Sequence, residues 1–439
     1  MNLPPNASPE FLSVESPLLV NHSPRGASRT AWLVVVLLMP VALLNYLDRQ
    51  MLASMQSSVM SSIPSLGEAP NREELWGFML GQFKWVYAVF SLVGGYVADR
   101  FSRRLTICSS LFVWSAVTWW TGRVTTYDEL LWTRSLMGVS EAFYIPAALA
   151  LIADHHTGET RSRAVGLHQM AIYLGVIIGG FGGYVAADPS LGWRIAFTSC
   201  GVLGMLYAVP LALILRDRND VRGVESAIKN SPLTTARVLL SNVSFLLLVM
   251  YFTLPAMAGW IVRDWMPAVL QKQFNIGQGY AGVTATIYWQ SAAILGAVLG
   301  GWLADRSMKS SDRGRINVSA TGVGLLAIAI LGIGHAETLA VAVAFLLLFG
   351  LGWGFFDCNN MPILSQIVRP EMRATGYGVM NFVSVSFGGL ADWGFGVLRD
   401  QKTPLSLILG TFAGVAALSI VLVLLIRPRS EVVSQEPLA

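Results

Sequence analysis

The sequence predicts an all-α polytopic membrane protein of twelve transmembrane helices, arranged as two pseudo-symmetric six-helix bundles. Three observations predict this fold: an apolar composition, apolar stretches of spanning length, and an internal repeat. Of the 439 residues, 54% are hydrophobic and only 13% are charged. One soluble core cannot bury so much apolar surface. We therefore expect the chain to lie in a lipid bilayer.

Apolar stretches recur along nearly the whole chain, from Ala31 to Ile426. A helix needs about 20 apolar residues to cross the hydrocarbon core. We expect twelve spans, at 31–56, 76–98, 104–124, 129–152, 162–186, 194–215, 240–268, 279–303, 317–334, 338–367, 374–397 and 405–426.

A polar segment divides these spans into two sets of six. We expect an N-terminal bundle over 31–215, a linker over 216–238 and a C-terminal bundle over 239–427. The remaining segments, 1–30 and 428–439, read as polar tails, the first of them disordered.

Basic residues set the orientation, because Lys and Arg resist translocation and stay in the cytoplasm. Twenty of the thirty Lys and Arg residues fall on the side of the termini and five on the other side. Both termini are therefore expected in the cytoplasm, with the protein in a plasma or bacterial inner membrane. The net charge of +4 reflects this topology and gives no support for nucleic-acid binding. Three isolated cysteines indicate neither a disulfide framework nor a metal site.

The two halves repeat each other. The segment 95–100, Gly-Tyr-Val-Ala-Asp-Arg, follows the second span, and 301–306, Gly-Trp-Leu-Ala-Asp-Arg, follows the eighth. Glu141 in the fourth span and Asp357 in the tenth occupy matching places at an offset of 216 residues. Duplication of this kind is common among membrane transport proteins.

The duplicated loops, with Arg103 and Arg104 completing the first copy, resemble the loop signature of the major facilitator superfamily over about residues 30–430. Within that superfamily, the segments 45–49 and 138–142 resemble the anion:cation symporters and the Spinster-like transporters. The resemblance implies a transporter, not an enzyme, that works by alternating access and needs no partner beyond substrate and lipid. A monomer is sufficient for this activity.

The resemblance also implies that the loop residues gate the cytoplasmic side, with Asp99 forming a contact that is made in the outward-open state and broken in the inward-open one. From the residues alone, the basic side chains could instead only enforce orientation. The gating candidates are Asp99, Arg100, Arg103, Arg104, Asp305 and Arg306.

Ionisable side chains inside a span are candidates for function, because a charge at that depth is costly unless it is paired or wetted. Asp48, Arg134 and Glu141 are the candidates for proton coupling. Arg134 precedes Glu141 by two helical turns, so both can face one side of their helix. In the resembling family, an Arg at this place is associated with proton coupling; an interhelical salt bridge is the alternative.

Arg49 and Lys84 are cations that a substrate anion could reach. If the anion competes with a carboxylate for either cation, proton binding and substrate binding become linked, which is the basis of symport. Lys84 stands where the resembling families have a small or apolar residue. It could bind substrate, or it could pair permanently with Asp48 or Glu141.

Further polar and aromatic side chains complete the predicted substrate site, although each neutral one could instead only pack. The predicted substrate ligands are Arg49, Lys84, Tyr87, Tyr144, Arg263, Tyr288, Gln290, Asp357, Asn359 and Asn381.

These observations favour proton-coupled symport of a small organic anion, such as a sugar acid, driven by the proton gradient without a metal or other cofactor. Sodium could replace the proton, since the same carboxylates could coordinate it. Two alternatives stay open at this point: a Spinster-like exporter of lipids or drugs, and a membrane sensor that binds ligand without transporting it.

Overall fold

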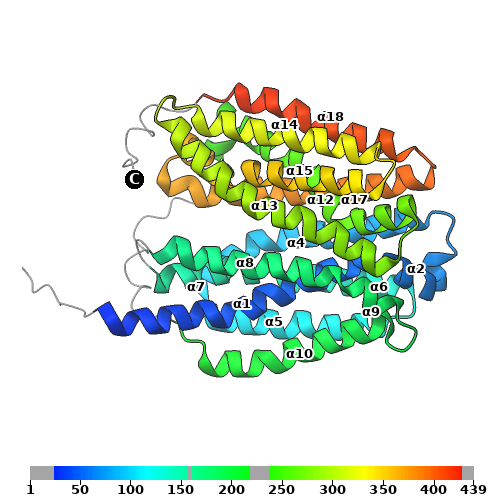
Figure 1. Ribbon diagram of the computed structural model, residues 1–439. Coiled ribbons are helices and arrows are strands. Elements are labelled where there is room, and N and C mark those ends of the chain that lie inside the picture. Colours follow the sequence, from blue (N-terminus) through cyan, green and yellow to red (C-terminus); the bar gives the residue numbers. More distant parts are fainter. Residues whose placement is uncertain (1–23, 157–159, 218–236, 428–439) are drawn as a thin grey trace, which may run out of the picture.

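Long helices run side by side through the structure, a computed structural model that describes residues 24–156, 160–217 and 237–427 (Figure 1). The predicted tails and most of the predicted linker lie outside these ranges. Every predicted span overlaps one long helix or a pair of consecutive helices.

The first half contains α1 (Pro24–Ser54), α4 (Arg72–Arg100), α5 (Arg103–Thr121), α6 (Tyr127–Glu141), α7 (Tyr144–His155), α8 (Arg161–Gly180), α9 (Gly182–Ala187) and α10 (Gly192–Ile214), with the short α2 (Gln56–Ser62) and α3 (Pro64–Gly67) after α1. The second half contains α12 (Val243–Phe274), α13 (Gln278–Met308), α14 (Gly314–Gly334), α15 (Leu339–Asp357), α16 (Asn360–Ile367), α17 (Arg373–Asp400) and α18 (Leu405–Leu424).

Within the described residues, nine helices or helix pairs are long and apolar enough to cross a membrane. Three helices that overlap predicted spans, α4, α5 and α17, are not among these nine. Polar side chains lower the apolar character of these helices, among them Lys84 on α4 and Asp392 on α17, both of which are buried in the protein. Because these charges face protein and not lipid, the helices can still lie within the bundles.

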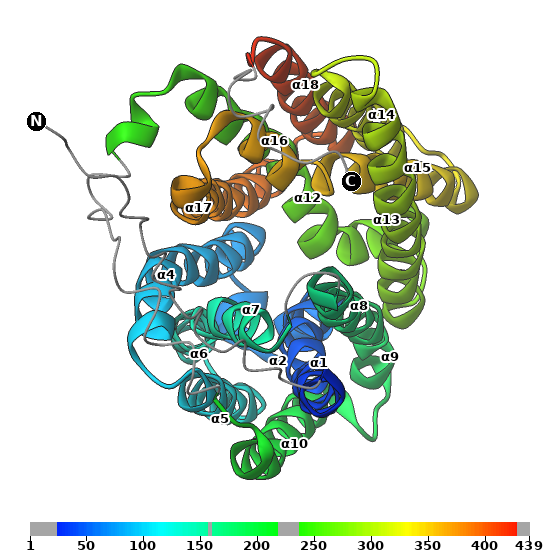
Figure 2. The same cartoon turned by 90° about the vertical axis from the view of Figure 1, so that its left-hand side faces the viewer.

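Figure 2 shows α1 to α10 grouped on one side and α12 to α18 on the other, and we call these groups the first and second bundle. They meet where α4 packs along α17, where α13 contacts α8 and α9, and where α1 contacts α12. We call the end of the molecule where α4 ends and α12 begins the linker face, on the left of Figure 1. The opposite end, with α2 and the end of α12, is the distal face.

Two helices break at matching places of the repeat. Glu141 is the last residue of α6 and Asp357 is the last residue of α15, and a short interruption follows each before α7 and α16 begin. Broken helices at mid-membrane depth are typical of transport proteins, where the free helix ends face a binding site. The two carboxylates that the repeat predicts to be equivalent thus also occupy the same position in the backbone, at the end of a broken helix.

The bundles are joined at the distal face. Glu73 on α4 forms an ion pair with Lys272 on α12, and the Oγ of Ser57 donates to the Oε1 of Gln278 at 2.6 Å. Asp400, at the end of α17, accepts from the backbone N of Glu74 at 2.7 Å. These contacts close this end of the structure.

At the linker face, the ion pairs between described side chains lie within one bundle. Arg103 pairs with Asp154 and so joins α5 to α7, while Asp305 and Arg315, 3.5 Å apart, join α13 to α14. The backbone N of Arg104 donates to Asp217 at 3.0 Å.

Among the remaining gating candidates, Arg100 is exposed, and Arg306 lies over the ring of Trp302 at 5.9 Å. The side chain of Asp99 lies outside the described part of the structure. A contact of Asp99 in the opposite state stays a prediction.

Glycines let α4 and α17 approach closely near the distal face. A Cβ added to Gly389 would lie 2.6 Å from Nε1 of Trp85 and 3.0 Å from the carbonyl oxygen of Gly81. Trp85 is held in place because its Nε1 donates to the carbonyl of Ser386 at 3.0 Å. Close helix contacts of this kind depend on small residues.

Gly389→Ala is therefore expected to separate the bundles at the distal face, at a cost to the closed state of about 1–3 kcal/mol. A cysteine placed at Ala268, which is 6% exposed and lines a pocket at the distal face, should be labelled faster by a membrane-impermeant maleimide. Gly394→Ala is the matched control, because Gly394 lies on the same helix and a Cβ added there would meet no atom within 4 Å. Equal labelling rates in the two variants would contradict the proposed role of the contact.

Candidate functional site

A cavity of about 290 Å³ lies between the two bundles. Six of the predicted substrate ligands line it: Arg49, Tyr87, Arg263, Gln290, Asp357 and Asn381. Leu149 and Tyr377 also line it and are 37% and 39% exposed, so solvent reaches the cavity. Because Leu149 lies on α7 less than two turns from its linker-face end, we infer that access is from the linker face.

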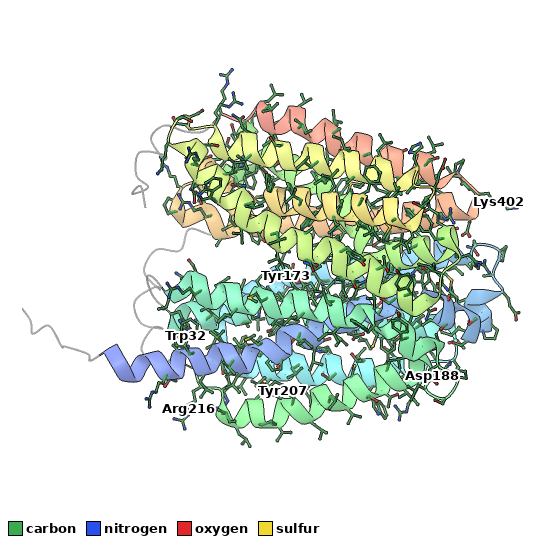
Figure 3. All side chains as sticks on the ribbon, viewed as in Figure 1. Trp32, Tyr173, Asp188, Tyr207, Arg216 and Lys402 are labelled. Carbon is green, nitrogen blue, oxygen red and sulfur yellow. The ribbon has the colours of Figure 1, made fainter. Side chains whose placement is uncertain are left out.

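Aromatic rings that were not among the predicted ligands supply much of the cavity wall. Tyr173 on α8 lies at the boundary between the bundles (Figure 3). The other aromatic side chains of the wall are Tyr46, Phe252, Trp260, Trp353, Phe356 and Tyr377. Sequence alone could not separate them from rings that only pack.

Besides Lys84, three predicted substrate ligands do not line this cavity, and their contact with substrate stays a prediction. Tyr144 is fully buried within the first bundle, where its hydroxyl lies 2.9 Å from Nε2 of His168. Asn359 is buried as well, and its Nδ2 donates to the carbonyl of Phe355 at 2.9 Å. Tyr288 is 38% exposed on α13 but does not line the cavity wall. Tyr144 and Asn359 thus bond within their own bundles.

Arg49 and Glu141 form an ion pair between α1 and α6. Nη2 of Arg49 lies 2.5 Å from Oε2 of Glu141, and Nε donates to the same oxygen at 2.7 Å. The guanidinium also lies 4.8–5.0 Å from the ring centres of Tyr46, Phe83 and Tyr87. The side chain of Glu141 is fully buried, whereas that of Arg49 retains 12% exposure and lines the cavity. A ligand can thus reach the cation but not its carboxylate.

A second pair lies behind the first. Asp48 and Arg134 approach to 3.7 Å, and both side chains are only 3% exposed. Thr118 Oγ1 donates to Asp48 at 2.6 Å, and Arg134 donates to Thr121 Oγ1 at 2.9 Å. Although Arg134 and Glu141 share a helix, the structure pairs Arg134 with Asp48 and not with Glu141. Neither Asp48 nor Arg134 lines the cavity.

A capping box at the start of α6 helps to fix the helix that supplies both Arg134 and Glu141. Oγ1 of Thr126 accepts from the backbone N of Glu129 at 3.3 Å, and the Glu129 carboxylate accepts from the backbone N of Thr126 at 3.3 Å. Such a box satisfies two of the backbone donors that a helix start leaves free.

Lys84 is buried in an ion cluster that the sequence did not reveal. Its Nζ lies 2.5 Å from Oδ2 of Asp264 on α12, pairs with Asp392 on α17, and lies 4.3 Å from the ring centre of Trp260. The structure therefore favours ion pairing over substrate binding, but with partners in the second bundle in place of Asp48 or Glu141. Two sequence signals were available: Asp264 and Asp392 are acidic residues inside predicted spans.

Arg263 and Asp357 are further charged side chains of the cavity wall. Arg263 lies 5.0 Å from the ring centre of Trp260 and 5.8 Å from that of Tyr46. Among the described residues, neither Arg263 nor Asp357 has an oppositely charged side chain within 4 Å. Asp357 is exposed to the cavity that it lines.

Comparisons with known proteins agree with this architecture. The family model described as "Major Facilitator Superfamily" matches residues 38–391. An "MFS-type efflux pump" of Mycolicibacterium smegmatis is 27% identical over 390 residues, which cover 87% of this chain and 88% of the relative. A "Probable L-galactonate transporter" of Escherichia coli is 28% identical over 316 residues, which cover 66% of this chain and 65% of the relative. The chain covers 60% of the "Protein spinster" of Drosophila melanogaster, to which it is 26% identical.

Solved structures show the same fold at lower identity. A crystal structure described as a bacterial homologue of the human lysosomal transporter Spinster, inward-facing and unoccupied, matches with a TM-score of 0.69 at 19% identity and covers 90% of this chain and 95% of its own. A D-xylose-proton symporter matches with a TM-score of 0.72 at 16% identity and covers 92% of this chain and 99% of its own. The family match spans most of the chain, and the helices have the matching arrangement. This protein therefore belongs to the major facilitator superfamily of membrane transporters.

Proposed function

We propose that the protein couples the movement of protons to the import of a small organic anion, such as a sugar acid, by alternating access. One observation carries the proposal: Arg49 lines the cavity while it is paired with a fully buried carboxylate, Glu141. The linker face is then the cytoplasmic face of a plasma or bacterial inner membrane, as the excess of Lys and Arg on that side indicates.

Competition for Arg49 is the proposed coupling step. A substrate carboxylate that reaches Arg49 displaces Glu141, which is then fully buried without a counter-charge. Because a buried, unpaired carboxylate is costly, a proton bound to Glu141 replaces the lost positive charge. Substrate and proton therefore favour each other's binding. The buried Asp48–Arg134 pair keeps this part of the first bundle neutral.

The rest of the cavity suits a small hydroxylated acid. Arg263 offers a second guanidinium, while Gln290 and Asn381 offer amide groups for hydroxyls. The volume of about 290 Å³ is at the lower end of the range of about 300–1,000 Å³ that is usual for ligand pockets. The similarity to the probable L-galactonate transporter supports the same class of substrate.

Flux measurements in liposomes test the proposal. A pH gradient is imposed that is acidic outside the liposomes. If one proton accompanies a monovalent anion and no membrane potential is present, a hexonate should reach an internal concentration about tenfold above the external one for each pH unit. The corresponding neutral sugar should not accumulate. Hexonate flux that ignores the pH gradient, or that follows a sodium gradient in its place, would refute proton coupling.

One observation favours export of an amphipathic molecule as a second candidate. The cavity wall is largely aromatic, and an apolar groove between α5 and α6, lined by Leu105, Val113 and Leu136, lies on the surface of the first bundle. The similarity to the efflux pump and to Spinster points the same way. Transport of a lysolipid or a cationic dye in the same liposomes, without hexonate flux, would favour this second function.

A further inference from the structure

Three charged side chains, contributed by both bundles, are buried together beneath the distal face. Lys84 of α4, Asp264 of α12 and Asp392 of α17 have side chains that are 3%, 10% and 0% exposed. Both carboxylates contact the same ammonium group. With all three ionised, the cluster has one positive and two negative charges.

Other cations near the cluster are already engaged or are not in contact with it. Arg49 and Arg134 line the same small void of about 30 Å³ as Lys84 and Asp264, but Arg49 pairs with Glu141 and Arg134 with Asp48. Arg263 also lines this void, and no ion pair within 4 Å joins it to either Asp264 or Asp392.

Charged groups farther along the same helices also have partners. Glu73 at the start of α4 pairs with Lys272 at the end of α12. Asp400 at the end of α17 accepts from the first backbone N–H groups of α4, and the indole of Trp393 on α17 donates to Glu74 at 3.3 Å. None of these groups supplies the missing positive charge to the cluster.

Burial of a charge without a counter-charge is costly, and Asp392 is the group most affected in this cluster. Oδ1 of Asp392 is buried and accepts no hydrogen bond of ordinary geometry from the described residues, although the indole of Trp265 lies close enough to interact with this carboxylate. A single added proton makes the cluster neutral, with one carboxylate ionised and the other protonated. Because two carboxylates share the ammonium group, the proton belongs to the pair and not to one residue.

We propose that Lys84, Asp264 and Asp392 form a proton-binding latch, which takes up one proton when the bundles close at the distal face and releases it when they separate there. Closure brings Asp264 and Asp392 from the second bundle onto Lys84 of the first. Separation admits water to all three groups, so that each can carry its charge. This inference does not depend on the substrate or on the Arg49–Glu141 pair.

The proposal fixes how closure depends on pH. The closed state binds one proton more than the open state, so closure is favoured as pH falls. The ratio of closed to open protein is expected to fall about tenfold for each unit of rising pH, wherever the open cluster is fully ionised. Charge counting then predicts a different dependence for each variant.

The experiment measures the distance across the distal face by electron paramagnetic resonance, in sodium-free liposomes without substrate. Spin labels are attached to cysteines at the exposed Ser61 and Gln401, after the three natural cysteines have been replaced by serine. Asp392→Asn and Asp264→Asn each leave a neutral cluster, so the ratio of closed to open protein should lose its pH dependence. Lys84→Met leaves two carboxylates, so the change should rise to about a hundredfold per pH unit.

The double variant Lys84→Met/Asp392→Asn leaves one carboxylate and should return the change to about tenfold per pH unit. This recovery separates the proposal from general damage to the fold. Glu73→Gln is the matched control: it removes another ion pair between α4 and α12, and the only group left without its partner is Lys272, which is 43% exposed. It should shift the ratio and leave its pH dependence unchanged.

Two further variants identify the group that titrates. Glu141→Gln and Arg263→Gln should both keep the tenfold dependence, whatever becomes of hexonate transport. The proposal is wrong if the unmodified protein shows no pH dependence, if Asp392→Asn keeps it, or if the ratio changes with sodium concentration in place of pH. If the Glu141→Gln variant loses the pH dependence of closure, the proton binds at the Arg49–Glu141 pair and not at the cluster.

Discussion

Glu141→Gln is expected to abolish proton-driven accumulation of substrate while leaving exchange of substrate across the membrane within a few-fold of its original rate. The Gln amide has nearly the shape of the carboxyl group, and its oxygen can accept the hydrogen bond that Arg49 Nε now donates at 2.7 Å. It carries no negative charge, however, and cannot take up a proton. Arg49 is then free to bind an anion at any pH, so binding and protonation are no longer linked.

Two measurements on one preparation of liposomes distinguish these effects. Gradient-driven uptake should fall to the level of equal concentrations inside and outside, whereas exchange of labelled for unlabelled hexonate should continue. Glu129→Gln is the matched control, because it removes a carboxylate from the same helix at the exposed capping box, which Gln can also complete. Uphill uptake by the Glu141→Gln variant would mean that another group, such as Asp48, carries the coupled proton.

Sequence alone was sufficient to predict the order of the helices. In a bilayer every backbone polar group needs an internal partner, so an apolar stretch of spanning length has little choice but to form a helix. The predicted spans accordingly overlap all the long helices or helix pairs, even α4, α5 and α17, whose polar side chains weaken the signal. The internal repeat likewise predicted that Glu141 and Asp357 are equivalent, and each ends a broken helix.

The partners of the buried charges could not be predicted in the same way. Spacing along one helix shows that Arg134 and Glu141 can share a side, but their partners depend on how α1 rotates against α6. Adjacent residues of α1 take those places, Asp48 beside Arg134 and Arg49 beside Glu141. Lys84 lies 308 residues before Asp392, and only the packing of α4 along α17 brings them together.

Arg49→Gln is expected to have two separable effects, one on stability and one on binding. The substitution leaves Glu141 fully buried without its cation, and removal of one partner from a buried ion pair costs about 3–5 kcal/mol. The midpoint of thermal unfolding in detergent should therefore fall clearly at neutral pH, and part of the loss should be recovered in acid, where Glu141 is protonated. Arg123→Gln is the control for loss of a guanidinium–aromatic contact, since Arg123 is exposed and lies 3.7 Å from the ring centre of Trp119.

The double variant Arg49→Gln/Glu141→Gln separates the two effects. It contains no unpaired buried charge at this place, so most of the lost stability should return. Binding of a hexonate should nevertheless stay weaker than in the unmodified protein by about 10- to 150-fold, the equivalent of about 1.5–3 kcal/mol for a hydrogen bond to a charged group. Binding of the neutral sugar should change little. If the double variant recovers stability and hexonate binding together, Arg49 serves only to neutralise Glu141, and Arg263 becomes the principal site for the anion.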